Sequence, residues 1–123
     1  MGKRNKSGEW IKFAPIVIGL LVTPVALRSA GILALSGPGA LTALYPWAEL
    51  LRSPLLGISA AIADGVGQWV MYLQFPIYGL AMTWMMLRKR SFGVALLVVV
   101  FFHVMSVVAV FGMSYLRELD LRL

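Results

Sequence analysis

The sequence has little with which to carry out chemistry: it has no cysteine, a single histidine and only five acidic residues among 123. The absence of cysteine excludes disulfides, thiolate metal sites and thiol nucleophiles. The zinc-protease motif HExxH, the phosphate-binding loop and a GxSxG serine motif within reach of the histidine are also absent, and no Asp or Glu lies deep in an apolar stretch. We therefore expect that the protein is not an enzyme and holds no metal ion.

Charged side chains of any kind are scarce. They make up 13% of the chain, and 60% of the residues are hydrophobic, whereas a soluble domain is about 25% charged and about 45–50% apolar. A soluble domain of this length buries only about two-thirds of its unfolded surface, so much of this apolar surplus would face water. The composition predicts an all-α integral membrane protein whose first partner is the lipid bilayer.

Three apolar stretches are long enough to cross a bilayer, because a helix rises about 1.5 Å per residue and the hydrocarbon core is about 30 Å thick. We predict transmembrane helices at residues 11–35, 65–87 and 92–115. The remaining parts of this single membrane domain are a cytoplasmic amino terminus (1–10), an outer interfacial helical segment (36–64), a cytoplasmic turn (88–91) and an outer carboxyl-terminal tail (116–123).

The three predicted spans differ in how strongly they favour the membrane. In the first, thirteen Ile, Leu, Val and Phe residues outweigh Arg28 near its outer end. A cleaved signal peptide is the alternative, but cleavage after Ala30 would put Arg28 where a small residue is required, so we favour an uncleaved span. The second span contains Gln68, Gln74 and Pro76, and it gains most from partner helices. The third inserts on hydrophobicity alone.

Basic residues gather in two clusters that flank the predicted spans. The clusters are Lys3, Arg4, Lys6 and Lys12 at the start and Arg88, Lys89 and Arg90 further on. Three crossings put both clusters on one side, and the positive-inside rule makes that side the cytoplasm. We thus expect a multi-pass protein of the inner or plasma membrane with its carboxyl terminus outside. The clusters serve as topology signals and contacts with anionic lipid, and we expect no nucleic-acid partner.

Residues 36–64 are too polar and too rich in proline for a crossing, yet too apolar for a free loop. We expect them to lie on the outer surface. Ser53 followed by Pro54 is a typical helix start. A helix from there to Leu87 would be about 51 Å long, which exceeds the bilayer, so we predict a break at residues 64–67.

His103 lies about 16 Å along the third span from Phe92. The same depth reaches Thr23 and Pro24 in the first span and Pro76 in the second, with Gln74 and Tyr78 adjacent. A candidate polar site at the membrane midplane is formed by His103, Tyr78, Gln74 and Thr23. In one interpretation, His103 is hydrogen-bonded to Tyr78 or Gln74 and holds two helices together. In the other, the site serves a proton, a quinone head group or a haem iron, and a second haem ligand would have to come from another chain.

The sequence as a whole favours an accessory or scaffold subunit of a larger membrane complex, with other membrane subunits or further copies of itself as partners and with no cofactor. Three helices leave most of their surface to neighbours, and the glutamines of the second span gain from other helices that bind them. The alternative is a redox or transport component in which His103 contacts a cofactor, a quinone or a proton path.

Overall fold

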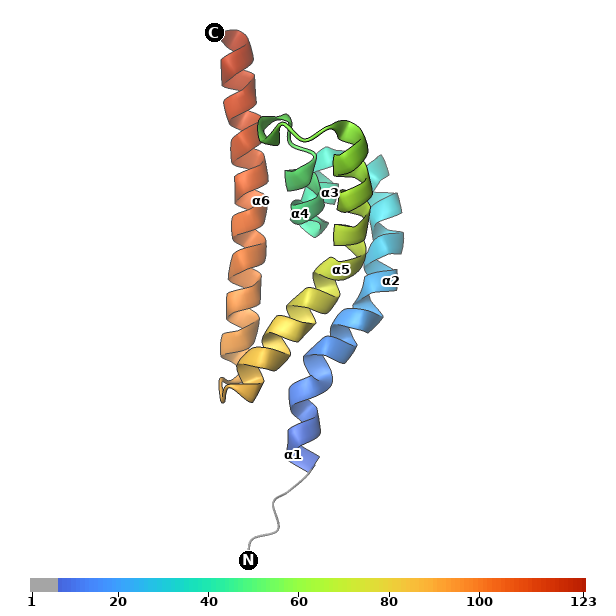
Figure 1. The fold of residues 1–123 in the computed structure, drawn as a ribbon, viewed down its shortest axis with the longest axis vertical. Coiled ribbons are helices and arrows are strands. Elements are labelled where there is room, and N and C mark those ends of the chain that lie inside the picture. The colour runs from blue at the N-terminus through green and yellow to red at the C-terminus, as the bar shows by residue number, and fades with distance from the viewer. Residues whose placement is uncertain (1–6) are drawn as a thin grey trace, which may run out of the picture.

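Every regular element in residues 7–123, the part of the chain that this computed structural model describes, is helical. Three helical stretches are long and apolar enough to cross a membrane. They are α2 (Ala14–Leu35), preceded by α1 (Ser7–Trp10) and the turn η1 (Ile11–Phe13), then α5 (Ala60–Leu87) and α6 (Phe92–Arg122). The short elements α3 (Pro38–Leu44), α4 (Pro46–Leu51) and η2 (Pro54–Leu56) connect α2 to α5 (Figure 1). The prediction of an all-α membrane protein with three spans is confirmed.

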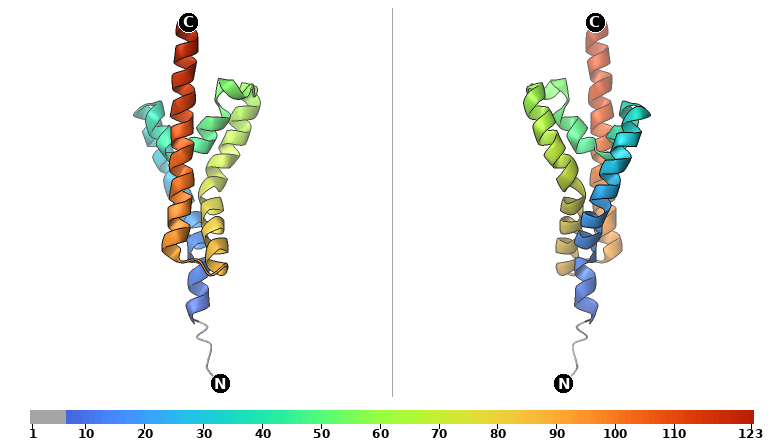
Figure 2. Two further views of the ribbon diagram at one scale, coloured as in Figure 1. Left: turned by 90° about the vertical axis from the view of Figure 1, so that its left-hand side faces the viewer. Right: turned by 90° about the vertical axis from the view of Figure 1, so that its right-hand side faces the viewer.

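Helices α2 and α5 pack closely where the first half of α2 meets the second half of α5, and their opposite ends diverge (Figure 2). Each contains an internal proline, Pro24 in α2 and Pro76 in α5. A proline inside a helix removes one backbone hydrogen bond and bends the helix. Both helices curve in Figure 1.

Two glycines set the distance between α2 and α5. A Cβ atom added to Gly19 would lie 2.5 Å from the carbonyl oxygen of Phe75. A Cβ atom added to Gly79 would collide with the carbonyl of Pro15 and lie 2.7 Å from the Cα of Ile16. Because these neighbours are backbone atoms, they have little freedom to move aside, and only glycine permits so close an approach.

The structure differs from the predicted boundaries at the start of α5 and at the end of α6. The predicted break at residues 64–67 is wrong, because α5 is continuous from Ala60. The chain breaks earlier, at Gly57, whose φ of 65° lies in the left-handed region that glycine adopts without strain. Pro54 begins only the single turn η2. Helix α6 continues to Arg122, so nearly all of residues 116–123 is helical.

Residues 38–51 fold inward, which differs from our expectation that the whole of residues 36–64 lies on the outer surface. Helices α3 and α4 form a hairpin, residues 38–51, that folds inward between α5 and α6 (Figure 1). Tyr45 and Ala48 are fully buried, in one cluster with Ala26 and Ala30 of α2. The small alanine side chains leave room for the tyrosine ring, so folding inward buries a large side chain that a surface helix would expose.

Helix α6 contacts the rest of the molecule along one side only. Ser91 caps its first turn, with the Val94 N–H donating to the hydroxyl oxygen at 3.2 Å. Ala95 packs against Met82 and Met86 of α5 close to the connecting turn. Only 6% of the most apolar stretch of α6 is buried, and the helix extends past the other elements at its carboxyl end (Figure 1).

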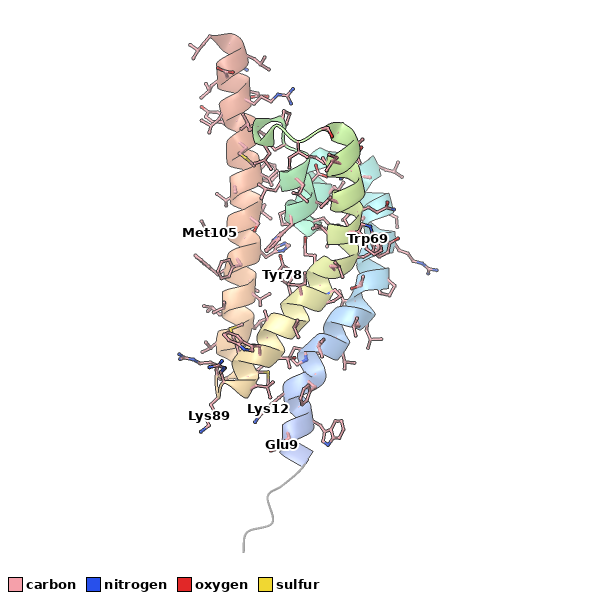
Figure 3. The ribbon with its side chains drawn as sticks, in the orientation of Figure 1. Glu9, Lys12, Trp69, Tyr78, Lys89 and Met105 are labelled. Carbon is pink, nitrogen blue, oxygen red and sulfur yellow. The ribbon has the colours of Figure 1, made fainter. Side chains whose placement is uncertain are left out.

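The two ends of the molecule carry different parts of the chain. Helix α1 and the turn between α5 and α6 lie at one end, and the carboxyl end of α6 lies at the other (Figure 2). Lys12 and Lys89 both lie at the first end (Figure 3). Lys3, Arg4 and Lys6 fall outside the described residues. The arrangement of the described residues fits three successive crossings.

Candidate functional site

At the tip of the hairpin, two backbone carbonyls without a partner in their own helix face the long helices α5 and α6. Helix α3 ends because Tyr45 precedes Pro46, and a residue before proline is disfavoured in the helical conformation; Tyr45 has φ −128° and ψ 60°. The last carbonyls of a helix have no intrahelical partner. Ala43 and Leu44 stand at this end, and both of their carbonyl oxygens accept hydrogen bonds from side chains of α5 and α6.

His103 joins three elements through its two ring nitrogens. Its Nε2 lies 2.8 Å from the Ala43 carbonyl oxygen, and its Nδ1 lies 3.1 Å from the hydroxyl oxygen of Tyr78. A carbonyl only accepts, so Nε2 carries the proton and donates. In the neutral imidazole, Nδ1 then accepts the proton of the Tyr78 hydroxyl. Both nitrogens of His103 are therefore used in holding α3, α5 and α6 together.

Gln74 makes a parallel contact one helical turn before Tyr78. Its Nε2 donates to the Leu44 carbonyl at 3.0 Å. The side chain is almost completely buried, and its Oε1 has no hydrogen-bond partner within residues 7–123. Gln74 therefore retains one unused acceptor in the interior. A buried amide oxygen without a donor lowers the stability of the fold.

Tyr78 is surrounded by aromatic rings from three elements. Its ring makes edge-to-face contacts with Trp47, Phe75 and His103 at centroid distances of 6.2, 6.1 and 5.8 Å. Figure 3 shows Tyr78 between α5 and α6. Such contacts orient the ring beyond what burial alone does. Trp47 thus lies at the depth of the histidine, whereas its position in residues 36–64 suggested the outer interface.

Thr23, the fourth residue of the predicted midplane site, does not join the other three. It is buried on α2, and its hydroxyl donates to the Gly19 carbonyl of its own helix at 2.8 Å. Counting residues gave a similar depth for Thr23 and His103, but it did not give the direction in which each side chain points. The polar cluster is therefore formed by His103, Tyr78 and Gln74 with the two hairpin carbonyls.

A second polar contact, which the sequence did not indicate, fixes the carboxyl end of α4. Arg52 donates to Glu49 at 2.9 Å and to Asp64 of α5 at 3.0 Å. Partial burial lowers the pKa of the Arg52 guanidinium, but the hydrogen bonds and attraction from both carboxylates outweigh this, so the pKa is raised. The Arg52 pairs tie the hairpin to the start of α5.

The basic turn between α5 and α6 carries three exposed cationic side chains. Arg88 lies over the Trp84 ring, with 5.1 Å from its guanidinium carbon to the ring centroid. Lys89 has a φ of 62°, an uncommon left-handed conformation that makes the turn tight. Arg88, Lys89 and Arg90 therefore project from one short turn.

The described residues offer one imidazole and scattered carboxylates as possible ligands. Within residues 7–123, no three His, Asp or Glu side chains are close enough together to bind one metal ion. No protein family, curated protein or solved structure matches this chain.

Proposed function

We propose that this chain is a non-catalytic accessory or scaffold subunit of a larger membrane complex. The observation that carries the proposal is the carboxyl-terminal part of α6. The 31 residues of this helix span about 46 Å, whereas the hydrocarbon core is about 30 Å thick. A span that starts at Phe92 leaves the hydrocarbon after about twenty residues. The last turns of α6 then lie beyond the lipid chains.

These last turns expose apolar side chains that lipid chains do not cover. Leu116 and Leu119 lie three residues apart on one side of the helix, and they are 59% and 41% exposed. Exposed leucines on a helix that leaves the membrane are typical of a surface that another protein covers. A second protein, either a different subunit or a further copy of this chain, accounts for them.

The geometry at His103 supports a structural role for this residue. Coordination of haem iron through Nε2 or Nδ1 would break the bond to Ala43 or the bond to Tyr78. A helix-end carbonyl or a buried hydroxyl would then lose its partner. We therefore assign His103 to the packing of the hairpin and assign no cofactor to the protein.

The proposal also includes an orientation. The amino terminus and the turn at residues 88–91 face the cytoplasm, and the end of α6 faces outward, in the inner or plasma membrane. Lys12 and Lys89 lie at one end of the molecule (Figure 3), and Arg88 and Arg90 flank Lys89 in the same turn, which supports this orientation through the positive-inside rule.

Purification in a mild detergent tests the role. We expect a larger membrane subunit to co-purify in fixed stoichiometry, or the chain to form a defined oligomer. Leu116→Ser together with Leu119→Ser should abolish this association without changing helical content, and the control Asp120→Ser should retain it. A monomeric chain with a Soret absorbance or a bound quinone would overturn the proposal and favour the redox alternative.

A further inference from the structure

An apolar cavity of about 330 Å³ lies between α5 and α6, beside the ring of Tyr78. Tyr78 and Trp84 of α5 and Val98 and Phe102 of α6 form its walls, and Trp47 at the hairpin tip lines it as well. No polar atom is exposed in it. Its volume is at the lower end of the range for small-molecule sites, about 300–1,000 Å³.

The position of the cavity along the helices matches one leaflet of a bilayer. Its lining on α5 runs from Ile77 to Met85, and the turn begins at Arg88. Arg88 lies eleven positions after Ile77, a distance of about 16 Å along the helix, which is close to half of a hydrocarbon core about 30 Å thick. The cavity thus reaches from just below the basic turn to the level of Tyr78.

The basic turn lies just beyond one end of the cavity and carries positive charge. Trp84 forms part of the cavity wall, and Arg88 lies against its ring at 5.1 Å. Lys89 and Arg90 follow directly and are exposed. Within residues 7–123, none of the three forms an ion pair with an acidic side chain; the ion pairs there belong to Arg52.

We propose that this site binds one anionic phospholipid, with an acyl chain in the cavity and the phosphate against Arg88, Lys89 and Arg90. An apolar cavity in a membrane selects weakly among lipids, because every lipid tail is as apolar as its walls. The charge of the head group supplies the preference. This site requires no protein partner, so it stands apart from the accessory role proposed above.

Binding measurements with two lipids test the head-group part. The full chain in detergent micelles would be titrated with phosphatidylglycerol and with phosphatidylcholine of the same acyl chains, and bound lipid would be counted by native mass spectrometry. We expect a preference of at least tenfold for phosphatidylglycerol. Neutralising Arg88, Lys89 and Arg90 to Gln should weaken its binding by roughly fivefold per charge removed. The matched variant with Arg28, Arg117 and Arg122 changed to Gln should keep the preference.

Filling the cavity tests the acyl-chain part. Phosphatidylglycerol with brominated chains should quench Trp84 in a protein whose other three tryptophans are phenylalanine. Ala81→Phe, and separately Val98→Phe, should remove this quenching, whereas Ala109→Phe on the exposed side of α6 should not. Circular dichroism and the thermal midpoint identify any variant that misfolds. If one of the two cavity variants misfolds, the quenching measured in the other one tests the acyl-chain site.

Three results would overturn the proposal. Equal affinity for the two lipids would remove the charge preference. Undiminished quenching in both cavity variants would show that the acyl chain binds elsewhere. Displacement of phosphatidylglycerol by millimolar inorganic phosphate would show that the basic turn binds phosphate without help from an acyl chain.

Discussion

The Nε2 atom of His103 lies 2.8 Å from the carbonyl oxygen of Ala43, a residue sixty positions earlier in the chain. The bond joins the end of a short helix to the middle of the third span. In a region without water, the carbonyl needs a donor and the imidazole needs an acceptor. We therefore expect the inward position of the hairpin to depend in part on His103.

Replacing His103 tests this dependence. We expect His103→Leu to lower the free energy of unfolding in detergent by about 1–2 kcal/mol, because it leaves the Ala43 carbonyl and the Tyr78 hydroxyl without partners; interhelical hydrogen bonds in membranes average about 0.6 kcal/mol, with a maximum near 1.7. His103→Gln keeps a donor and an acceptor and should cost less. Unfolding titrations in mixed micelles measure both variants.

The control for this prediction is Ser106→Ala, one turn further along α6. The Ser106 hydroxyl donates to the carbonyl of Phe102 in its own helix at 2.7 Å, so its removal separates no elements. We expect a change below about 0.5 kcal/mol. If His103→Leu were no more destabilising than Ser106→Ala, the histidine would not hold the hairpin.

Thiol accessibility tests the inward fold of the hairpin. The chain has no cysteine, so each introduced thiol is read without background. Ala48 is 0% exposed and Leu55 is 56% exposed. A membrane-impermeant maleimide should label Leu55→Cys rapidly and Ala48→Cys slowly, both in proteoliposomes and in detergent. Equal labelling rates would mean that residues 38–51 lie on the surface, as the sequence suggested.

The spans could be predicted because they depend on local properties. A run of about twenty apolar residues is sufficient to predict a transmembrane helix, whatever it packs against. Depth along a span is also local, since the rise per residue is constant, and counting residues is enough to place His103 at the level of Tyr78 and Gln74. The hydrogen bond between His103 and Tyr78 is one of the contacts that this counting suggested.

The remaining features depend on contacts between distant residues. Thr23 has a suitable depth, but its direction follows from how α2 packs on α5, and its hydroxyl returns to its own helix. The acceptors at Ala43 and Leu44 are backbone atoms, which every residue has, so the sequence does not mark them. Tyr45 followed by Pro46 was the available signal, because it predicts a helix end inside an apolar segment. The sequence did not show that this end turns inward.

The close packing of α2 on α5 gives a prediction about glycine. A Cβ at Gly79 would meet the backbone of Pro15 and Ile16, so Gly79→Ala must push the helices apart. We expect it to destabilise the protein by about 1–3 kcal/mol, the usual cost of overpacking. Thermal unfolding monitored by circular dichroism measures the change.

Gly93 provides the matched control, since a Cβ there would meet nothing within 4 Å. Gly93→Ala near the start of α6 should be neutral or slightly stabilising, because alanine favours the helix by up to about 1 kcal/mol over glycine. If both variants lowered stability equally, the close approach at Gly79 would not be important for packing.

The final prediction concerns orientation. If the basic clusters set the topology, alkaline phosphatase, which is active only outside the cytoplasm, should be active when fused after Leu123 and inactive when fused after Arg90. A reporter that is active only in the cytoplasm, fused at the same two positions, should give the opposite pattern and controls for expression.

Changing Arg88, Lys89 and Arg90 to Gln removes the positive charge of the turn and should reduce the difference in reporter activity between the two positions. The third span inserts on hydrophobicity alone, and the basic residues decide its direction. Activity after Arg90 with none after Leu123 would reverse the proposed orientation, and equal activity at both positions would contradict a crossing by α6.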